Sequence, residues 1–319
     1  MGEAAGAFPH EQGEDGSWQR QTSAFREWVR ADGSTPFTPD AGRYHLYVSL
    51  ACPLAHRAVI MRRLRGLEDA ISMTVVDPER DERGWAIRPD QPGCTDDPVN
   101  GFVFLSEAYA ASDPAFEGRV TVPVLWDTVE GRIVSNESAD VLRMLNVEFR
   151  GVARNPDPTY YPEELADEME ALMDDVYERV NNGVYSCGFA TSQEAYEKAF
   201  RALFACLDDL EERLGSHRYL MGDRLTEADW RLFTTLVRFD PVYVGHFKCN
   251  LRRVADHPHL SGFLRELYQM PGIAETVNLD HIKRHYYRTH HTINPTGIVP
   301  LGPELDWDRP HGREGVGGR

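Results

Sequence analysis

The chain has 319 residues, and its 34 Lys or Arg against 51 Asp or Glu give a formal net charge of −17. This length can bury a sizeable core and fits two domains of ordinary size. The acidic surplus argues against nucleic acid or an anionic membrane as a partner. No apolar run reaches the roughly 18 residues that a transmembrane helix needs.

The termini and the cysteines indicate a reducing compartment. The N-terminus lacks the basic start and the apolar core of a signal peptide. The cysteines are Cys52, Cys94, Cys187, Cys206 and Cys249, an odd and scattered set that is too sparse for a disulfide framework. We therefore expect a cytoplasmic protein.

The first part of the chain predicts an α/β domain. Residues 1–42 are expected to be an N-terminal extension, with folded structure beginning near Arg43. A strand, a helix and a second strand at 71–76 imply a parallel crossover. After a polar insertion at 77–116, a hairpin and a helix from about 137 to 145 complete a thioredoxin-like pattern over residues 43–146.

The second part of the chain reads as helical. Residues 147–162 are expected to be a linker, 163–280 an all-helical domain, and 281–319 a C-terminal segment and tail. One helix is expected over 163–180. Capping boxes starting at Thr191 and Thr226 predict the starts of two more helices, with Asp229 reaching back to Thr226.

Cys52 lies where the first strand becomes the first helix. Pro53 suits the first helical position, so Cys52 is the expected N-cap, with unpaired backbone N–H groups directed at its sulfur. A helix N-terminus favours negative charge, and the thiolate is the reactive form of cysteine. We expect Cys52 to be a nucleophile, and because the motif Cys-Pro-Leu-Ala has no second cysteine, disulfide chemistry must use an external thiol.

Several segments together resemble one known family. They are residues 44–57, 119–127, 133–139, 181–185 and 238–250, followed by His285-Tyr-Tyr287 and Ile293-Asn-Pro295. In them the chain resembles the Xi-class glutathione transferases, also called glutathionyl-hydroquinone reductases, from about residue 18 to about residue 302. One departure is plain: the family usually has Cys-Pro-Trp-Ala, and this chain has Leu54 in place of the tryptophan.

The resemblance implies an α+β glutathione-transferase fold, with an N-terminal thioredoxin-like α/β domain, a C-terminal all-α domain and a cis proline at Pro123. It implies a reductase that removes glutathione, or an equivalent thiol, from S-conjugated hydroquinones through a mixed disulfide on Cys52. Glutathione is then the cosubstrate, and no cofactor is tightly bound. Because Leu54 replaces the family's tryptophan, mycothiol is an alternative cosubstrate. A homodimer is also implied, with the segment from about Asp280 contributing to its interface.

The resemblance also assigns roles to residues that match the family's motifs. Cys52, Tyr185 and Tyr286 are expected in catalysis, and Tyr185, Tyr243 and Tyr286 in the hydroquinone pocket. The thiol cosubstrate is expected to contact Trp85, Arg119, Val122, Glu137 and Ser138.

Each assignment has a plainer alternative. Glu137 and Ser138 can be ordinary capping residues, Trp85 a core aromatic and Arg119 a solvated surface charge. Tyr287 can exchange roles with Tyr286.

A metal site and two other functions are the alternatives to this interpretation. His281 and His285 are four residues apart, but no constellation of Cys or carboxylate ligands accompanies them, so we expect no metal site. An Omega-like Cys transferase or thiol-disulfide reductase, and a non-catalytic interaction module, remain as alternatives.

Overall fold

The computed structural model describes residues 11–317 of the chain, so the ends of the expected extension and tail lie outside it. The chain divides into two compact units. Unit 1 comprises Gln21–Thr159 and Glu275–Thr292, and unit 2 comprises residues 11–20, Tyr160–Ala274 and residues 293–317.

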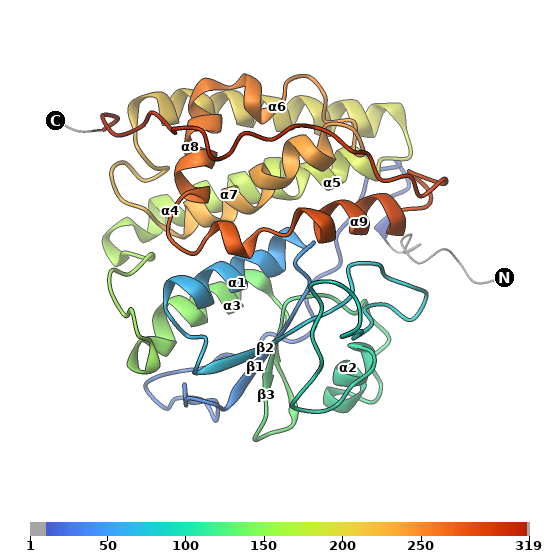
Figure 1. Ribbon diagram of the computed structural model, residues 1–319, viewed down its shortest axis with the longest axis vertical. Coiled ribbons are helices and arrows are strands. Elements are labelled where there is room, and N and C mark those ends of the chain that lie inside the picture. The colour runs from blue at the N-terminus through green and yellow to red at the C-terminus, as the bar shows by residue number, and fades with distance from the viewer. Residues whose placement is uncertain (1–10, 318–319) are drawn as a thin grey trace. The chain divides into compact units, whose positions relative to one another are not determined.

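Unit 1 is built on a four-stranded sheet with the order β2-β1-β3-β4 (Figure 1). The strands are β1 (Tyr44–Val48), β2 (Ile71–Val75), β3 (Val124–Asp127) and β4 (Arg132–Ser135). β1 runs parallel to β2 and antiparallel to β3, and β3 pairs with β4 as an antiparallel hairpin. The predicted crossover and hairpin are therefore confirmed. Every residue of β1 is buried, as expected for a strand covered on both faces.

The helices of unit 1 follow the ends of these strands. They are α1 (Pro53–Leu64), α2 (Ser106–Ser112), α3 (Ser138–Val147), the 3-10 turn η2 (Glu148–Val152) and α9 (Leu279–Thr289). α1 and α3 pack side by side next to the sheet (Figure 1). α2 gives the long insertion some structure of its own, and the backbone bridge between Ala86 and Phe104 gives it more.

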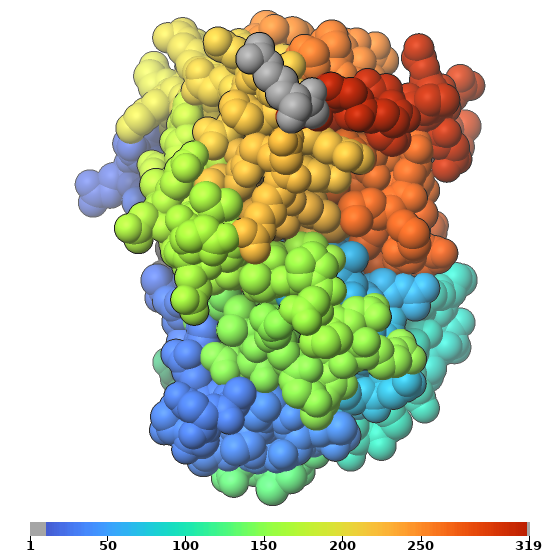
Figure 2. Space-filling view, turned by 90° about the vertical axis from the view of Figure 1, so that its left-hand side faces the viewer, coloured from blue at the N-terminus to red at the C-terminus, as the bar shows by residue number. Residues whose placement is uncertain are grey.

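The expectation that folded structure begins near Arg43 is wrong. Residues 21–42 run along unit 1, where the backbones of Phe25 and Asn136 are linked by a 3.0 Å bond from Asn136 N to Phe25 O. Val29 in this segment is completely buried. Figure 2 shows the segment as blue surface beside the green surface of unit 1. Its partners lie more than a hundred residues away in the sequence, so its own composition could not identify them.

Unit 2 is helical. Its α-helices are α4 (Ala166–Val176), α5 (Gly183–Gly188), α6 (Gln193–Ser216), α7 (Glu227–Arg238) and α8 (Pro258–Tyr268). Short 3-10 turns lie at η3 (Glu163–Leu165) and η6 (Val254–Asp256), π-helical turns at η4 (Tyr177–Asn181) and η5 (Phe239–Tyr243), and the 3-10 turn η7 (Ala274–Thr276) begins at the end of this unit. All residues of α7 are buried, so this helix forms the centre of the unit.

One predicted capping box is confirmed and the other is wrong. Thr226 N donates to Asp229 Oδ2 at 2.7 Å, and the full reciprocal box opens α7. α6 instead begins one residue later than predicted, because Ser192 rather than Thr191 accepts the bond from Ala195 N, at 3.1 Å. The single helix expected over 163–180 is also wrong in detail, since a 3-10 turn precedes α4 and a π-helical turn follows it.

Between residues 11 and 317, no helix is both long enough and apolar enough to cross a bilayer.

Candidate active site

Cys52 occupies the position predicted for it. It is the N-cap of α1, with extended backbone angles (φ −77°, ψ 123°), and Pro53 is the first helical residue. The thiol is half-buried, and its Sγ lies 3.7 Å from the carbonyl oxygen of Val122. The peptide bond between Val122 and Pro123 is cis, as expected. The sulfur thus lies between a helix N-terminus and the backbone that precedes β3.

The chain's other cysteines differ from Cys52 in their surroundings. Burial raises the pKa of Cys94 to about 11 and that of Cys206 to about 12, and it raises the pKa of Cys249 well above its ordinary value. Cys187 is buried in unit 2. Since the thiolate is the nucleophile, Cys94, Cys206 and Cys249 are poor candidates for catalysis at neutral pH.

The N-terminus of α3 brings Glu137 and Ser138 together. Glu137 is the N-cap and accepts a 3.1 Å bond from Ala139 N, while its other carboxylate oxygen accepts a 2.8 Å bond from Ser23 Oγ. Ser138 is the first residue of the helix and is 3% exposed. These bonds agree with the alternative that Glu137 and Ser138 are ordinary capping residues. The same two positions also combine a carboxylate, a hydroxyl and a helix N-terminus.

Two neighbours of this group were missed in the sequence. The first is Ser23, which comes from the N-terminal extension. The second is Arg57, whose buried guanidinium lies 3.4 Å from Ser138 Oγ. Arg57 belongs to α1 and Ser138 to α3, so this contact adds positive charge beside the N-terminus of α3. No local pattern could have indicated it.

Trp85 and Arg119 lie in different parts of unit 1. Trp85 is 4% exposed, within the insertion, and its indole stacks on the ring of His285 with centroids 5.1 Å apart. The guanidinium of Arg80 lies 5.2 Å from the centre of the same indole. Arg119 is half-buried in the segment between α2 and β3.

Tyr286 is buried in unit 1. Its ring, on α9, makes T-shaped contacts with the rings of His285 and His290, at centroid distances of 5.2 and 5.4 Å. Tyr286 is 1% exposed, whereas Tyr287 is half-buried. Burial raises the pKa of Tyr287, so its phenol stays protonated at neutral pH.

Tyr185 and Tyr243 belong to one aromatic cluster in unit 2. Their ring centroids are 6.2 Å apart, and Phe247 stacks on Tyr243 at 5.4 Å. Trp18 stacks on Tyr185 at 5.5 Å, and the Arg20 guanidinium lies 5.1 Å from the Tyr185 ring. The part played by Trp18 and Arg20 was missed, because they lie some 165 residues before the tyrosine that they cover.

The histidines of α9 contact backbone carbonyls. His281 Nε2 lies 2.7 Å from Pro92 O, and His285 Nδ1 lies 2.7 Å from Pro78 O. Across residues 11–317, no three His, Cys, Asp or Glu side chains form a group that could hold a metal ion.

Two family models match the chain. The glutathione S-transferase N-terminal domain matches residues 51–148, and the glutathione S-transferase C-terminal domain matches residues 193–266. These matches cover the sheet with Cys52 in unit 1 and the central helices of unit 2.

Individual proteins are similar over almost the whole chain. Glutathionyl-hydroquinone reductase YqjG of Escherichia coli is 55% identical over 94% of this chain and 93% of its own length. Its glutathione-bound structure covers 94% of this chain and 98% of that chain, with a TM-score of 0.88.

Two further relatives agree. Glutathionyl-hydroquinone reductase PcpF of Sphingobium chlorophenolicum is 51% identical over 90% of both chains. The Xi-class glutathione transferase of Natrialba magadii is 50% identical, covers 96% of this chain and 97% of its own, and has a TM-score of 0.91. On these matches, the chain belongs to the glutathione transferases, in the Xi class that includes the glutathionyl-hydroquinone reductases.

Proposed function

We propose that the protein is a glutathionyl-hydroquinone reductase, which uses glutathione to release hydroquinones from their S-glutathionyl conjugates. The observation that carries this proposal is the Cys52 thiol at the start of α1, in a chain 55% identical to a reductase of that name. The glutathione bound in the structure of that relative supports glutathione as the cosubstrate.

The reaction proceeds in two steps, and in each of them a thiolate attacks a sulfur atom. The Cys52 thiolate attacks the sulfur of the conjugate, the bond from that sulfur to the ring carbon breaks, and the ring carbon takes a proton. Tyr286 or Tyr185 supplies that proton. A second glutathione thiolate then attacks the mixed disulfide on Cys52, which gives glutathione disulfide and restores the thiolate. The hydroquinone gains the two electrons that the two glutathione sulfurs lose.

Binding of the thiol peptide follows from the chemistry of its groups. Glu137 pairs with the α-ammonium, and Ser138 with the N–H groups of α3 holds the glutamyl carboxylate. The backbone of Val122 pairs with the cysteinyl unit as a short β-strand. Trp85 and Arg119 receive the glycyl carboxylate.

The hydroquinone itself is assigned to three tyrosines. Tyr185, Tyr243 and Tyr286 carry phenolic groups that can hydrogen-bond a quinol oxygen and rings that can cover its faces. The aromatic neighbours of each of these tyrosines support this role.

The test is the release of free hydroquinone from a glutathionyl-hydroquinone, with wild type, Cys52→Ala and Cys94→Ala compared. Turnover should vanish in Cys52→Ala and persist in Cys94→Ala, and mass spectrometry of the wild type without added thiol should find one glutathionyl group on Cys52. The assay is repeated with mycothiol as reductant, because Leu54 replaces the tryptophan that the family usually has beside the sulfur.

Other outcomes point to the alternatives. Turnover of simple mixed disulfides without release of hydroquinone would indicate an Omega-like thiol-disulfide reductase. No reaction of Cys52 with any conjugate or disulfide would indicate an interaction module.

We also propose a cytoplasmic homodimer. The free cysteines fit a reducing compartment, and dimerisation is the expectation from the family. Light scattering coupled to size-exclusion chromatography tests the assembly, and a single monomer mass at micromolar concentration would refute it.

A further inference from the structure

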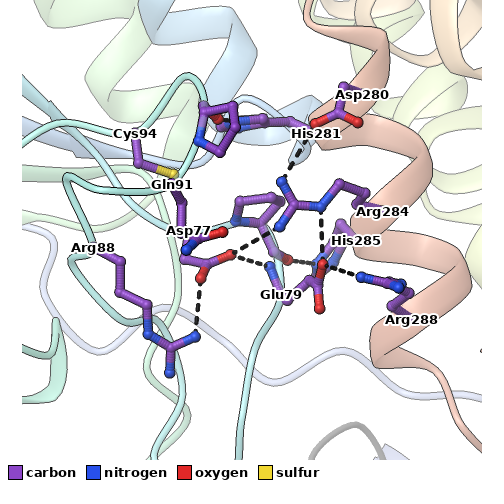
Figure 3. A network of polar contacts seen from close by, with 12 residues as sticks. Asp77, Glu79, Arg88, Gln91, Cys94, Asp280, His281, Arg284, His285 and Arg288 are labelled. Carbon is purple, nitrogen blue, oxygen red and sulfur yellow. Dashed lines mark hydrogen bonds and ion pairs between the residues drawn. The ribbon is translucent and has the colours of Figure 1, made fainter.

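Helix α9 is bound to the start of the insertion by charged side chains (Figure 3). Glu79 accepts hydrogen bonds from Arg284 Nε at 2.8 Å and from Arg288 at 3.0 Å. Arg284 also lies 4.0 Å from the carboxylate of Asp77 and donates to Asp280 at 3.3 Å. The contacts of Arg284 with Glu79 and Asp77 therefore fix α9 against residues 77–79, while Asp280, one turn earlier in the same helix, orients the Arg284 side chain.

The surroundings of these groups strengthen the contact. The Asp77 side chain is 3% exposed and that of Arg284 is 17% exposed, so solvent screens them less than a surface pair. Burial alone would raise the pKa of Glu79, but the hydrogen bonds from Arg288 and Arg284 outweigh it and lower that pKa. Glu79 is thus charged at neutral pH and the contact persists.

Two histidines of α9 also bind the backbone of the insertion. His285 Nδ1 lies 2.7 Å from Pro78 O, and His281 Nε2 lies 2.7 Å from Pro92 O (Figure 3). A carbonyl oxygen only accepts, so each of these ring nitrogens carries the proton. Gly93, beside Pro92, has φ +77°, and a Cβ there would lie 2.7 Å from His281 Nε2. The insertion and α9 therefore approach closely at both ends of the contact.

His285 uses this fixed position to contact Trp85. Its ring lies 5.1 Å from the indole, at an interplanar angle of 22°. On the Trp85 main chain, the carbonyl accepts a 2.9 Å bond from Leu105 N, so the backbone has its own anchor. The indole plane, in contrast, is set by the groups stacked on it. The His285 ring also makes a T-shaped contact with Tyr286, with centroids 5.2 Å apart, so one imidazole contacts two residues assigned to the substrates.

We propose that His285 is a positioning residue, whose ring holds the Trp85 indole in the orientation that receives the glycyl end of the thiol peptide. This rests on the proposed function, in which Trp85 contacts that end. The hydrogen bond to Pro78 and the ion pairs of Arg284 hold α9, and through it the imidazole, in place. His285 touches neither the sulfur nor the quinol ring in this role.

The experiment compares two conjugates of one hydroquinone. One carries glutathione, and the other carries γ-glutamylcysteine, which lacks the glycine. The wild type should prefer the full conjugate in kcat/KM by about tenfold, the effect expected of one charge-assisted contact. Loss of the positioning ring should abolish this preference, whereas general destabilisation should lower kcat/KM for both conjugates equally.

Two substitutions separate the ring from the hydrogen bond. His285→Phe keeps the aromatic ring, and His285→Asn keeps a donor for the Pro78 carbonyl but removes the ring. We expect His285→Phe to retain most of the preference for the full conjugate and His285→Asn to lose it. His291→Asn, the same change at an exposed histidine just beyond α9, serves as the matched control and should behave as wild type.

If His285→Asn retains the preference and His285→Phe loses it, His285 serves only to hydrogen-bond the insertion, and the inference is overturned. A wild type that turns over both conjugates equally would overturn it as well. If the wild type turns over neither conjugate, the proposed function fails. The dissociation constants of glutathione and γ-glutamylcysteine, measured by tryptophan fluorescence, then test His285 by the same comparison of variants.

Discussion

The carboxylate of Glu137 gives the sharpest test of the thiol-binding site. Glu137→Gln removes the charge but keeps an oxygen that can accept the capping bond from Ala139 N, 3.1 Å away. A hydrogen bond to a charged group contributes about 1.5–3 kcal/mol and a neutral one about 0.5–1.5 kcal/mol. The midpoints of these ranges differ by about 1.2 kcal/mol, which corresponds to about eightfold weaker binding of an ammonium group.

The assay is calorimetric titration of glutathione in a Cys52→Ser background, where no disulfide can form. Glu148→Gln is the matched control, because Glu148 ends the same helix and accepts bonds from Arg30 at 3.0 Å and Ala31 N at 2.9 Å. Its Kd for glutathione should match that of the parent. A change below twofold in Glu137→Gln would show that Glu137 is only a cap, and the assignment of the ammonium to it would be wrong.

Two further predictions concern stability. Asp229→Ala should lower the free energy of unfolding by about 4 kcal/mol, because it leaves the buried N–H groups of Leu220 and Thr226 without an acceptor at about 1–3 kcal/mol each; urea unfolding followed by circular dichroism measures this, and a loss below about 1 kcal/mol would contradict it. Burial lowers the pKa of His45 to about 4, while its ring nitrogens lie 2.6 and 2.9 Å from Ser72 Oγ and Thr74 Oγ1. The unfolded chain then binds the extra proton between about pH 6.5 and pH 4, so stability should fall as pH decreases through that window, by up to about 3 kcal/mol. His45→Gln should lack this part of the pH dependence, and an equal slope in both proteins would refute the assignment.

Local features of the chain were predictable from the sequence. Cys52-Pro53 after an alternating run defined the N-cap of α1, and Thr226 with Asp229 defined the start of α7. In both cases the determining atoms lie within three residues of each other. The strands were also predictable, because their apolar runs end at turn residues.

Long-range contacts were not predictable. Glu79 and Arg284 are 205 residues apart, and each reads as an ordinary surface charge by itself. Phe25 and Asn136 are 111 residues apart, so no local pattern could indicate which residues the N-terminal segment contacts. Sequence reasoning therefore named the residues to which we assign the chemistry, and it gave no indication of the contacts that Arg57, Ser23 and His285 make with them.

The sheet of unit 1 explains why the remaining site residues come together. β1 is antiparallel to β3, and β3 is antiparallel to β4, so β1 and β4 run in the same direction, as does β2. The segments that follow these three strands therefore leave the sheet at the same edge. They are the N-terminus of α1 with Cys52, the insertion that leads to Trp85, and the N-terminus of α3 with Glu137.

Strand direction alone places Cys52 and Glu137, because each caps a helix that begins directly after its strand. Trp85 differs, since it lies ten residues beyond the end of β2. A position that far along an insertion is not set by the strand direction: hydrogen bonds such as that from Leu105 N fix its backbone, and another element contacts its indole. α9 supplies that element, which is why we expect changes in His285 to affect the glycyl end of the thiol peptide while changes in α3 affect the glutamyl end.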